Sequence, residues 1–231
     1  KGLTSKLDYI QGLGFNSIWI TPPVKNRYVQ GDSAAYHGYW GLDFTTIDPH
    51  LGTEEDFKNF VTEAHSRGIK VIVDIVINHT GDIIRYKGDV YSYSDIASYP
   101  YKDCNGKKID ITKYIGKANF PKLCAAKSFP VPPTVSEKNK SVKAPAFLND
   151  ITNYHNRGDS TFEGESSTFG DFFGLDDVFT EKPEVVAGWT KVWQDWITKF
   201  DIDGYRIDTA KHVNPEFWQA FIPAVLKTAK A

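Results

Sequence analysis

The chain has 231 residues, of which 41% are hydrophobic and 24% are charged, and its formal net charge is −2. This is the composition of a globular protein of one or two packed units. The near-neutral balance gives no reason to expect nucleic acid or an anionic membrane as a partner, and no apolar run approaches the roughly 18 residues that span a bilayer. Neither a signal-peptide pattern nor a Met occurs, so we expect a processed or excised part of a longer protein.

A helix followed by a strand is predicted at the start of the chain. Apolar residues recur there at helical spacing, at Leu3, Leu7, Ile10 and Leu13. Residues 15–20 then have the pattern of a strand, which Pro22 and Pro23 end.

A second helix and strand follow. Thr53 with Asp56 three residues later is close to a capping box, and Gly68 fits the position just after a helix. Residues 69–77 are almost continuously apolar, which is typical of a parallel strand covered on both faces. The sequence therefore predicts one more helix–strand unit of the same kind.

The rhythm breaks between residues 80 and 178, which are rich in Tyr, Gly, Pro, Asp and Asn. A structureless loop of this length is unusual in a compact domain, so we predict an inserted subdomain. It contains both cysteines, Cys104 and Cys124. A disulfide between them would close a loop of about 20 residues and stabilise the fold by roughly 3 kcal/mol, as in exported proteins. Two free thiols are the alternative.

Regular structure is predicted again from residue 179 to the end. Apolar residues between 185 and 200 lie on one helical face, residues 202–207 predict a strand, and residues 215–230 predict a last helix. The alternation implies an α/β fold with parallel strands, either a doubly wound sheet or part of a (β/α)₈ barrel. Three strands are too few to close a barrel, and the lack of a glycine-rich phosphate loop disfavours a nucleotide-binding sheet.

Polar residues gather where the predicted strands end, which is where α/β proteins place their active sites. In the third strand, Arg206 and Asp208 are two residues apart and therefore share a face. An arginine beside a carboxylate keeps it ionised and oriented, as a retaining glycosidase requires of its nucleophile. A structural ion pair is the alternative. Asp74, in the second strand, is expected to neutralise Arg206.

Three histidines, His37, His79 and His212, follow three different strands. Neutral imidazoles can hydrogen-bond sugar hydroxyls, and Tyr39 offers a ring face to a sugar. Each of these residues could instead be an ordinary packed side chain.

Four segments resemble hallmark segments of the α-amylase family of glycoside hydrolases. They are Tyr36-His-Gly-Tyr-Trp40, Asp74-Ile-Val-Ile-Asn-His79, Gly174-Leu-Asp-Asp-Val178 and Gly204-Tyr-Arg-Ile-Asp-Thr-Ala-Lys-His212. The resemblance covers essentially the whole chain, although Asp176 stands where the family commonly has proline. It implies a (β/α)₈ TIM barrel fragment, strands 2–4 with their helices, with an irregular domain B inserted after strand 3. The implied ranges are 1–79 and 179–231 for the barrel and 80–178 for domain B.

The resemblance also implies roles for individual residues. It makes Asp208 the catalytic nucleophile, supported by Arg206. It implies sugar binding at the cleaved residue by His37, Tyr39 and His79, and on the reducing side by Lys211 and His212. It further implies a structural Ca²⁺ held by Asn78, Asp177 and the main-chain carbonyl of His212, all hard oxygen donors.

The implied function is retaining hydrolysis of α-glucosidic bonds in starch-like α-glucans. Its general acid, a Glu, is expected beyond the end of this chain, so activity of the 231-residue piece alone is doubtful. The alternatives are a non-catalytic glucan-binding or scaffold relative, and a pullulanase-type or transglycosylase-type member of the family. An α-glucan is the expected partner, without nucleic acid or membrane insertion, and an extracellular or periplasmic location follows from a polymeric substrate and the cysteine pair.

Overall fold

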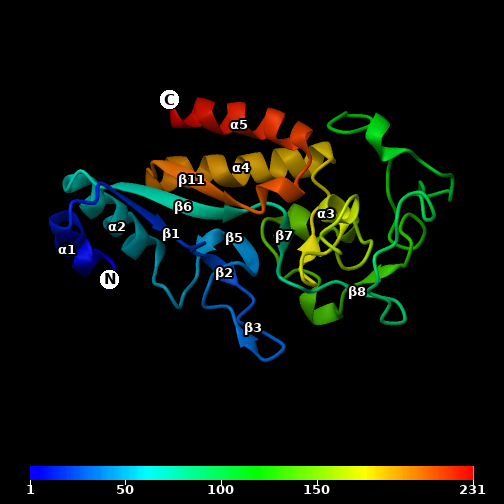
Figure 1. Cartoon of the computed structure of the whole chain (residues 1–231), viewed down its shortest axis with the longest axis horizontal. Helices are drawn as coiled ribbons and strands as arrows, with labels where there is room; N and C mark the ends of the chain where they lie inside the picture. The colour runs from blue at the N-terminus through cyan, green and yellow to red at the C-terminus, as the bar shows by residue number, and fades with distance from the viewer. Residues whose placement is uncertain (231) are drawn as a thin grey trace.

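A three-stranded parallel sheet lies at the centre of the computed structural model, which describes residues 1–230 (Figure 1). Its strands follow one another in chain order, β1 (Ser17–Ile20), β6 (Lys70–Val76) and β11 (Gly204–Asp208). Ser17 pairs with Lys70, and Arg206 pairs with Asp74. The carboxyl ends of all three strands therefore point the same way, towards the inserted segment.

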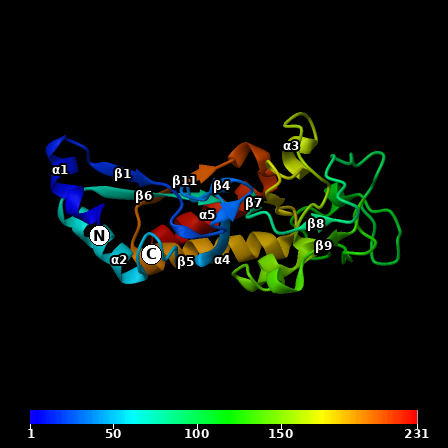
Figure 2. The same ribbon diagram turned by 90° about the horizontal axis from the view of Figure 1, so that it is seen from below.

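The long helices cover one face of this sheet only (Figure 2). They are α2 (Glu54–Ser66), α4 (Pro183–Phe200) and α5 (Pro215–Ala229). A doubly wound sheet carries helices on both faces, whereas a (β/α)₈ barrel has sequential strands with helices outside only. Of the two architectures left open by the sequence, the observed arrangement is that of a barrel wall.

Aromatic packing fixes these helices to the sheet. The indoles of Trp189 and Trp193 are fully buried with ring centroids 6.2 Å apart, and the Trp196 indole donates a hydrogen bond of 2.8 Å to the Phe44 carbonyl. The predicted capping box is present at the start of α2, where Thr53 and Asp56 each accept the other's backbone N–H. Among residues 1–230, no helix is long and apolar enough to cross a membrane.

Two predictions for the first 50 residues were incomplete. The first helix is a 3₁₀ turn (Thr4–Lys6) followed by a short α1 (Leu7–Gly12), and of its predicted apolar face only Leu7 is buried. A seven-residue strand, β5 (Gly41–Ile47), was not predicted, because its burial does not alternate regularly. It pairs with β2 (Val24–Asn26) with irregular register, and a small hairpin joins β3 (Val29–Gln30) to β4 (Ser33–Ala34).

The inserted segment has little regular structure. Its short elements are β7 (His79–Thr80), β8 (Arg85–Tyr86), β9 (Pro133–Thr134), α3 (Ser166–Phe169), β10 (Asp176–Asp177) and 3₁₀ turns at Ile111–Lys113, Glu137–Asn139, Ala146–Asn149 and Ile151–Asn153. Strands β7 and β10 pair antiparallel, so the two ends of the segment meet. The domain boundaries at 79 and 178 stay a prediction.

The predicted disulfide is confirmed between Cys104 and Cys124. It lies beside a second small core, separate from the main one, formed by Tyr101, Ile111, Leu123, Phe129 and Phe179. Because this core contains so few apolar side chains, the cross-link has a large share in holding it together.

We therefore expect the double substitution Cys104→Ala/Cys124→Ala to lower the free energy of unfolding by about 3 kcal/mol, the entropy of closing a loop of this length. Urea unfolding monitored by tryptophan fluorescence measures the change. Reductant should lower the midpoint of the parent protein and leave that of the variant unchanged. Equal responses of the two proteins to reductant would contradict the prediction.

Candidate active site

A row of charges crosses β6 and β11 on the sheet face that the helices leave open. The Arg206 Nη1 donates to Asp74 Oδ2 at 3.0 Å and to Asp208 Oδ1 at 2.7 Å. Asp74 has no exposed side-chain surface, whereas 18% of the Asp208 side chain is accessible. One arginine therefore bridges a buried carboxylate and a partly open one, and the predicted pairing with Asp74 is confirmed.

Asp74 is held by two aromatic donors as well. The Tyr39 hydroxyl donates to its Oδ2 at 2.8 Å and the Trp19 indole donates to the same atom at 3.2 Å. Burial raises the pKa of Asp74, while the hydrogen bond from Tyr39 and the charge of Arg206 act against that rise. Burial, with the hydrogen bond to Asp74, also raises the pKa of Tyr39 to about 12, so its hydroxyl stays a donor at neutral pH. Asp74 thus fixes Arg206 and Tyr39 in place.

A cleft of about 360 Å³ opens beside Asp208. It is lined by Gln30, His37, Tyr39, Trp40, His79, Phe172, Phe173, Leu175, Asp208 and Thr209. Three buried polar atoms on its lining residues, Gln30 Oε1, His79 Nε2 and Thr209 Oγ1, have no hydrogen-bond partner within residues 1–230. Because unpaired buried polar groups are costly, three of them around one cleft indicate a polar ligand. A larger hollow of about 550 Å³ between β5 and α4 contains none of the predicted site residues.

The two histidines of the cleft are neutral donors. Burial lowers the pKa of His79 to about 4 and also lowers that of His37. The Nδ1 of His79 faces the side-chain amide of Asn78 at 3.3 Å, and the Nδ1 of His37 accepts the Tyr39 backbone N–H at 3.0 Å. With Nδ1 as an acceptor in each ring, we assign the proton to Nε2, the atom left for a ligand.

Lys211 and His212, which are predicted to bind the sugar on the reducing side, do not line this cleft. The His212 ring is buried and bonds the Ser167 carbonyl through Nδ1 at 2.6 Å. It lies edge-on to Phe172, which also stacks on His79. Lys211 is exposed, without a carboxylate partner among the described residues. The structure thus brings His37, Tyr39, His79 and Asp208 together and leaves Lys211 and His212 at the periphery.

Sequence reasoning gave no role to six residues that line the cleft, namely Gln30, Trp40, Phe172, Phe173, Leu175 and Thr209. Thr209 and Phe173 have positive φ angles of 50° and 52°, a strained backbone that often marks functional sites. Thr209 could have been found, since it directly follows Asp208. Gln30 comes from a hairpin without any motif.

Two of the residues expected to hold calcium, Asn78 and Asp177, lie close to each other. The Val178 N–H donates to the Asn78 carbonyl at 2.8 Å, which sets Asn78 beside Asp177 in the buried interior. Asp177 and Glu181 share one imidazole, His155, at 2.5 and 2.7 Å, and Glu181 Oε1 has no partner among residues 1–230. Burial raises the pKa of Asp177 to about 7 despite His155.

Two buried carboxylates that share one imidazole provide oxygen atoms of the kind that a hard cation binds. Within residues 1–230, however, no group of three or more His, Cys, Asp or Glu side chains is arranged to hold a metal ion. The expected set, with one carboxylate, one amide and one main-chain carbonyl, is not a cluster of that kind.

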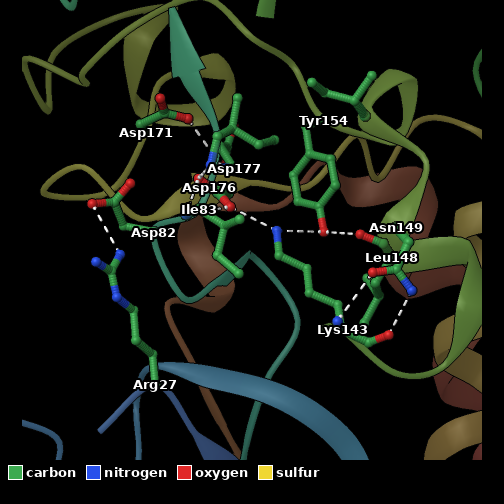
Figure 3. A network of polar contacts seen from close by, with 12 residues as sticks. Arg27, Asp82, Ile83, Lys143, Leu148, Asn149, Tyr154, Asp171, Asp176 and Asp177 are labelled. Atoms are coloured by element: carbon green, nitrogen blue, oxygen red, sulfur yellow. Dashed lines mark hydrogen bonds and ion pairs between the residues drawn. The ribbon is translucent and has the colours of Figure 1, made fainter. Parts of the chain in front are cut away.

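Asp176, which departs from the family pattern, has a structural explanation (Figure 3). Its carboxylate accepts the backbone N–H groups of Ile83 and Ile84 and forms a buried ion pair of 2.6 Å with Lys143. The Lys143 ammonium also donates to the Tyr154 hydroxyl at 2.9 Å. Burial by itself would lower the pKa of Lys143, but Asp176 and Tyr154 together outweigh burial and raise that pKa. The Asp176 carboxylate therefore connects β10 both to the residues that follow β7 and to Lys143.

Comparison with known proteins agrees with this geometry. A family model described as "Alpha amylase, catalytic domain" matches residues 1–223. The alpha-amylase of Streptomyces lividans is 50% identical over 97% of this chain and 25% of its own length. The periplasmic alpha-amylase of Escherichia coli is 33% identical over 95% of this chain and 36% of its own. The alpha-amylase of Geobacillus thermoleovorans, crystallised with acarbose, superposes with a TM-score of 0.58 at 32% identity, covering 98% of this chain and 37% of that one.

The chain therefore belongs to the alpha-amylase catalytic-domain family, and its sheet is a fragment of a TIM-barrel-type fold. It spans between a quarter and somewhat over a third of the length of these relatives.

The Lys143–Asp176 pair provides a test of how the segment is held. Lys143→Met leaves a buried carboxylate unpaired and should lower the free energy of unfolding by about 3–5 kcal/mol. The double substitution Lys143→Met/Asp176→Asn removes both charges. Its loss in free energy of unfolding should be smaller than the sum of the losses for Lys143→Met and Asp176→Asn. The matched control is Lys140→Met, which breaks an exposed pair with Glu137 and should cost less than about 1 kcal/mol. Urea midpoints give the values, and equal losses for Lys143→Met and Lys140→Met would refute the assignment.

Proposed function

We propose that the complete protein is a retaining hydrolase of α-glucosidic bonds in starch-like α-glucans, with Asp208 as its nucleophile. The observation that carries the proposal is the cleft itself. An arginine-held carboxylate opens onto it beside three buried polar atoms that lack partners. The homology to alpha-amylases supports the substrate class.

In this mechanism the Asp208 carboxylate attacks the anomeric carbon of the sugar and forms a covalent glycosyl–enzyme intermediate. A general acid about 5 Å away protonates the leaving oxygen and then activates the water that releases the sugar. We assign that acid to a Glu outside these 231 residues. Arg206 donates to Oδ1 of Asp208 and leaves the other carboxylate oxygen free to attack, while Asp74 balances the charge of Arg206.

The sugar at the cleaved position would be bound by His37, Tyr39 and His79. Both imidazoles are neutral, so their Nε2–H groups can donate to hydroxyls without adding positive charge near the developing oxocarbenium ion. Lys211 and His212 would bind the sugar on the reducing side, as the family resemblance implies.

We assign β1, β6 and β11 to the second, third and fourth barrel strands and residues 80–178 to domain B. The barrel ranges are then 1–79 and 179–231. The pairing of β7 with β10, which closes the inserted segment at its base, supports this division.

We further propose a structural Ca²⁺ held by Asn78, Asp177 and the His212 carbonyl. When bound, the ion would tie domain B to the barrel through hard oxygen ligands. Support comes from the position of Asn78 beside Asp177 and from the surplus of buried carboxylate around His155.

An extracellular or periplasmic location is proposed from two observations. The chain contains a disulfide, which persists in oxidising compartments, and a relative from Escherichia coli is named a periplasmic alpha-amylase. A non-catalytic glucan-binding relative is the first alternative, and the activity measurement below tests it. A pullulanase-type or transglycosylase-type enzyme is the second.

Asp208→Asn in the complete protein should reduce the hydrolysis of soluble starch by about 10⁴-fold or more, the scale on which removal of a covalent nucleophile acts. Asp201→Asn is the matched control. Its carboxylate lies seven residues earlier, is 96% exposed, and occupies a left-handed position that Asn tolerates. Asp201→Asn should retain full activity. Starch hydrolysis by Asp208→Asn at the parent rate would exclude the assignment, and no hydrolysis by the parent would favour a binding protein.

Removal of calcium should lower the thermal midpoint of the complete protein by several degrees, because the ion binds the folded state alone. The chelator effect should disappear in Asp177→Asn and persist in Asp150→Asn, which changes an exposed aspartate of the same segment. Differential scanning calorimetry with and without chelator measures both shifts. A thermal midpoint of the parent protein that does not change with chelator would contradict the calcium proposal.

A further inference from the structure

The charge of the chain is unevenly distributed. Residues 102–140 contain nine lysines, three acidic residues and no arginine, a net charge of +6. Because the whole chain carries −2, the remainder carries −8. The near-neutral total therefore hides a strongly basic segment, which both views place at the end of the molecule remote from α1 (Figures 1 and 2).

Five exposed lysines of this segment are brought together by the fold. This lysine patch consists of Lys102, Lys107, Lys108, Lys122 and Lys127. Lys102 and Lys108 are partners in an antiparallel bridge, and the Lys102 N–H donates to the Ser128 carbonyl at 3.2 Å. The Cys104–Cys124 disulfide ties the 102–108 turn to the 122–127 stretch.

Nothing nearby neutralises these charges. None of the five ammonium groups has an Asp or Glu oxygen within 4.0 Å among residues 1–230. The nearest acidic residue in sequence, Asp103, uses its Oδ1 to accept the backbone N–H groups of Asn105 and Lys107. Like charges placed opposite each other destabilise a strand pair. A cross-linked turn that holds them there indicates an anionic partner.

The surroundings of the patch restrict what that partner can be. The large apolar side chains that are exposed in this region, Tyr99 and Val142, lie outside residues 100–141. A membrane-binding surface would need exposed apolar anchors, and single-stranded nucleic acid would need aromatic rings for stacking. Lysine, unlike arginine, acts as a hydrated point charge without bidentate geometry. These features suit dispersed anionic groups on a hydrated polymer.

We propose that the lysine patch binds phosphate monoester groups carried by an α-glucan. The proposal rests on the proposed function, since the carboxyl ends of the strands, where the candidate sugar site opens, point towards the same inserted segment. A phosphate monoester carries close to two negative charges at pH 7, and five lysines can pair with it wherever it occurs along the chain. The patch would favour phosphorylated over neutral glucan without touching the bond that is cleaved.

The test uses the complete protein with Asp208→Asn, so that binding is measured without hydrolysis. Affinity electrophoresis in gels with phosphorylated or dephosphorylated soluble starch should show about tenfold tighter binding to the phosphorylated polymer at low salt. Changing all five patch lysines to Gln should remove this preference. The matched control, Lys6, Lys25, Lys58, Lys70 and Lys227 changed to Gln, removes the same charge from exposed barrel positions and should retain it.

Two conditions identify the anion. The preference should shrink with added salt, because exposed charges are screened. It should also fall between pH 7 and pH 5, as the monoester loses its second charge near pH 6 while lysines stay protonated. Each of three outcomes would overturn the proposal. They are a preference for phosphorylated starch that does not change over that pH range, an equal loss of this preference in the control variant, and tighter binding to anionic phospholipid vesicles than to phosphorylated starch. Failure of the proposed function is separate, because it would appear as no starch hydrolysis by the parent enzyme.

Discussion

Arg206 lies between two carboxylates on adjacent parallel strands, and the candidate site depends on this arrangement. The register of β6 and β11 places Arg206 opposite Asp74, and strand alternation places Asp208 on the same face. Asp74 is fully buried and balances the arginine, which also holds the partly open Asp208 beside it. A shift of one residue in this register would turn the face of β11 and separate Arg206 and Asp208 from Asp74.

Buried polar contacts hold the base of the inserted segment. Asp176 bonds two backbone N–H groups and Lys143, and His155 bridges Asp177 and Glu181, all within the interior. Buried ion pairs of this kind add little net stability compared with well-packed apolar groups, yet breaking one of them is costly. They fix a unique geometry at the base of the segment, where His79 stacks on Phe172 beside the cleft.

The same segment separates two kinds of surface. Near the barrel it contributes the apolar side chains of Phe172, Phe173 and Leu175 to the cleft, whereas its outer part carries the lysine patch on a disulfide-linked turn. A polymer is long enough to contact both surfaces at once. If the lysine patch binds the polymer as proposed, weak electrostatic contacts outside the cleft would raise the local concentration of the substrate and leave the proposed chemistry at Asp208 unaltered.

The sequence by itself determined the alternation of helices and strands, the position of Asp208 next to Arg206 and the pairing of Asp74 with that arginine. Each of these follows from periodicity, strand alternation or motif, which are local properties of the chain. Whether the strands formed a doubly wound sheet or a barrel wall was decided only by the tertiary structure, because helices on one face or on two give the same periodicity. Gln30 and Phe173 line the cleft, and the Lys102 backbone reaches Ser128, because hairpins and a cross-link bring distant segments together. No local pattern encodes such contacts, since they depend on the path of the chain between them.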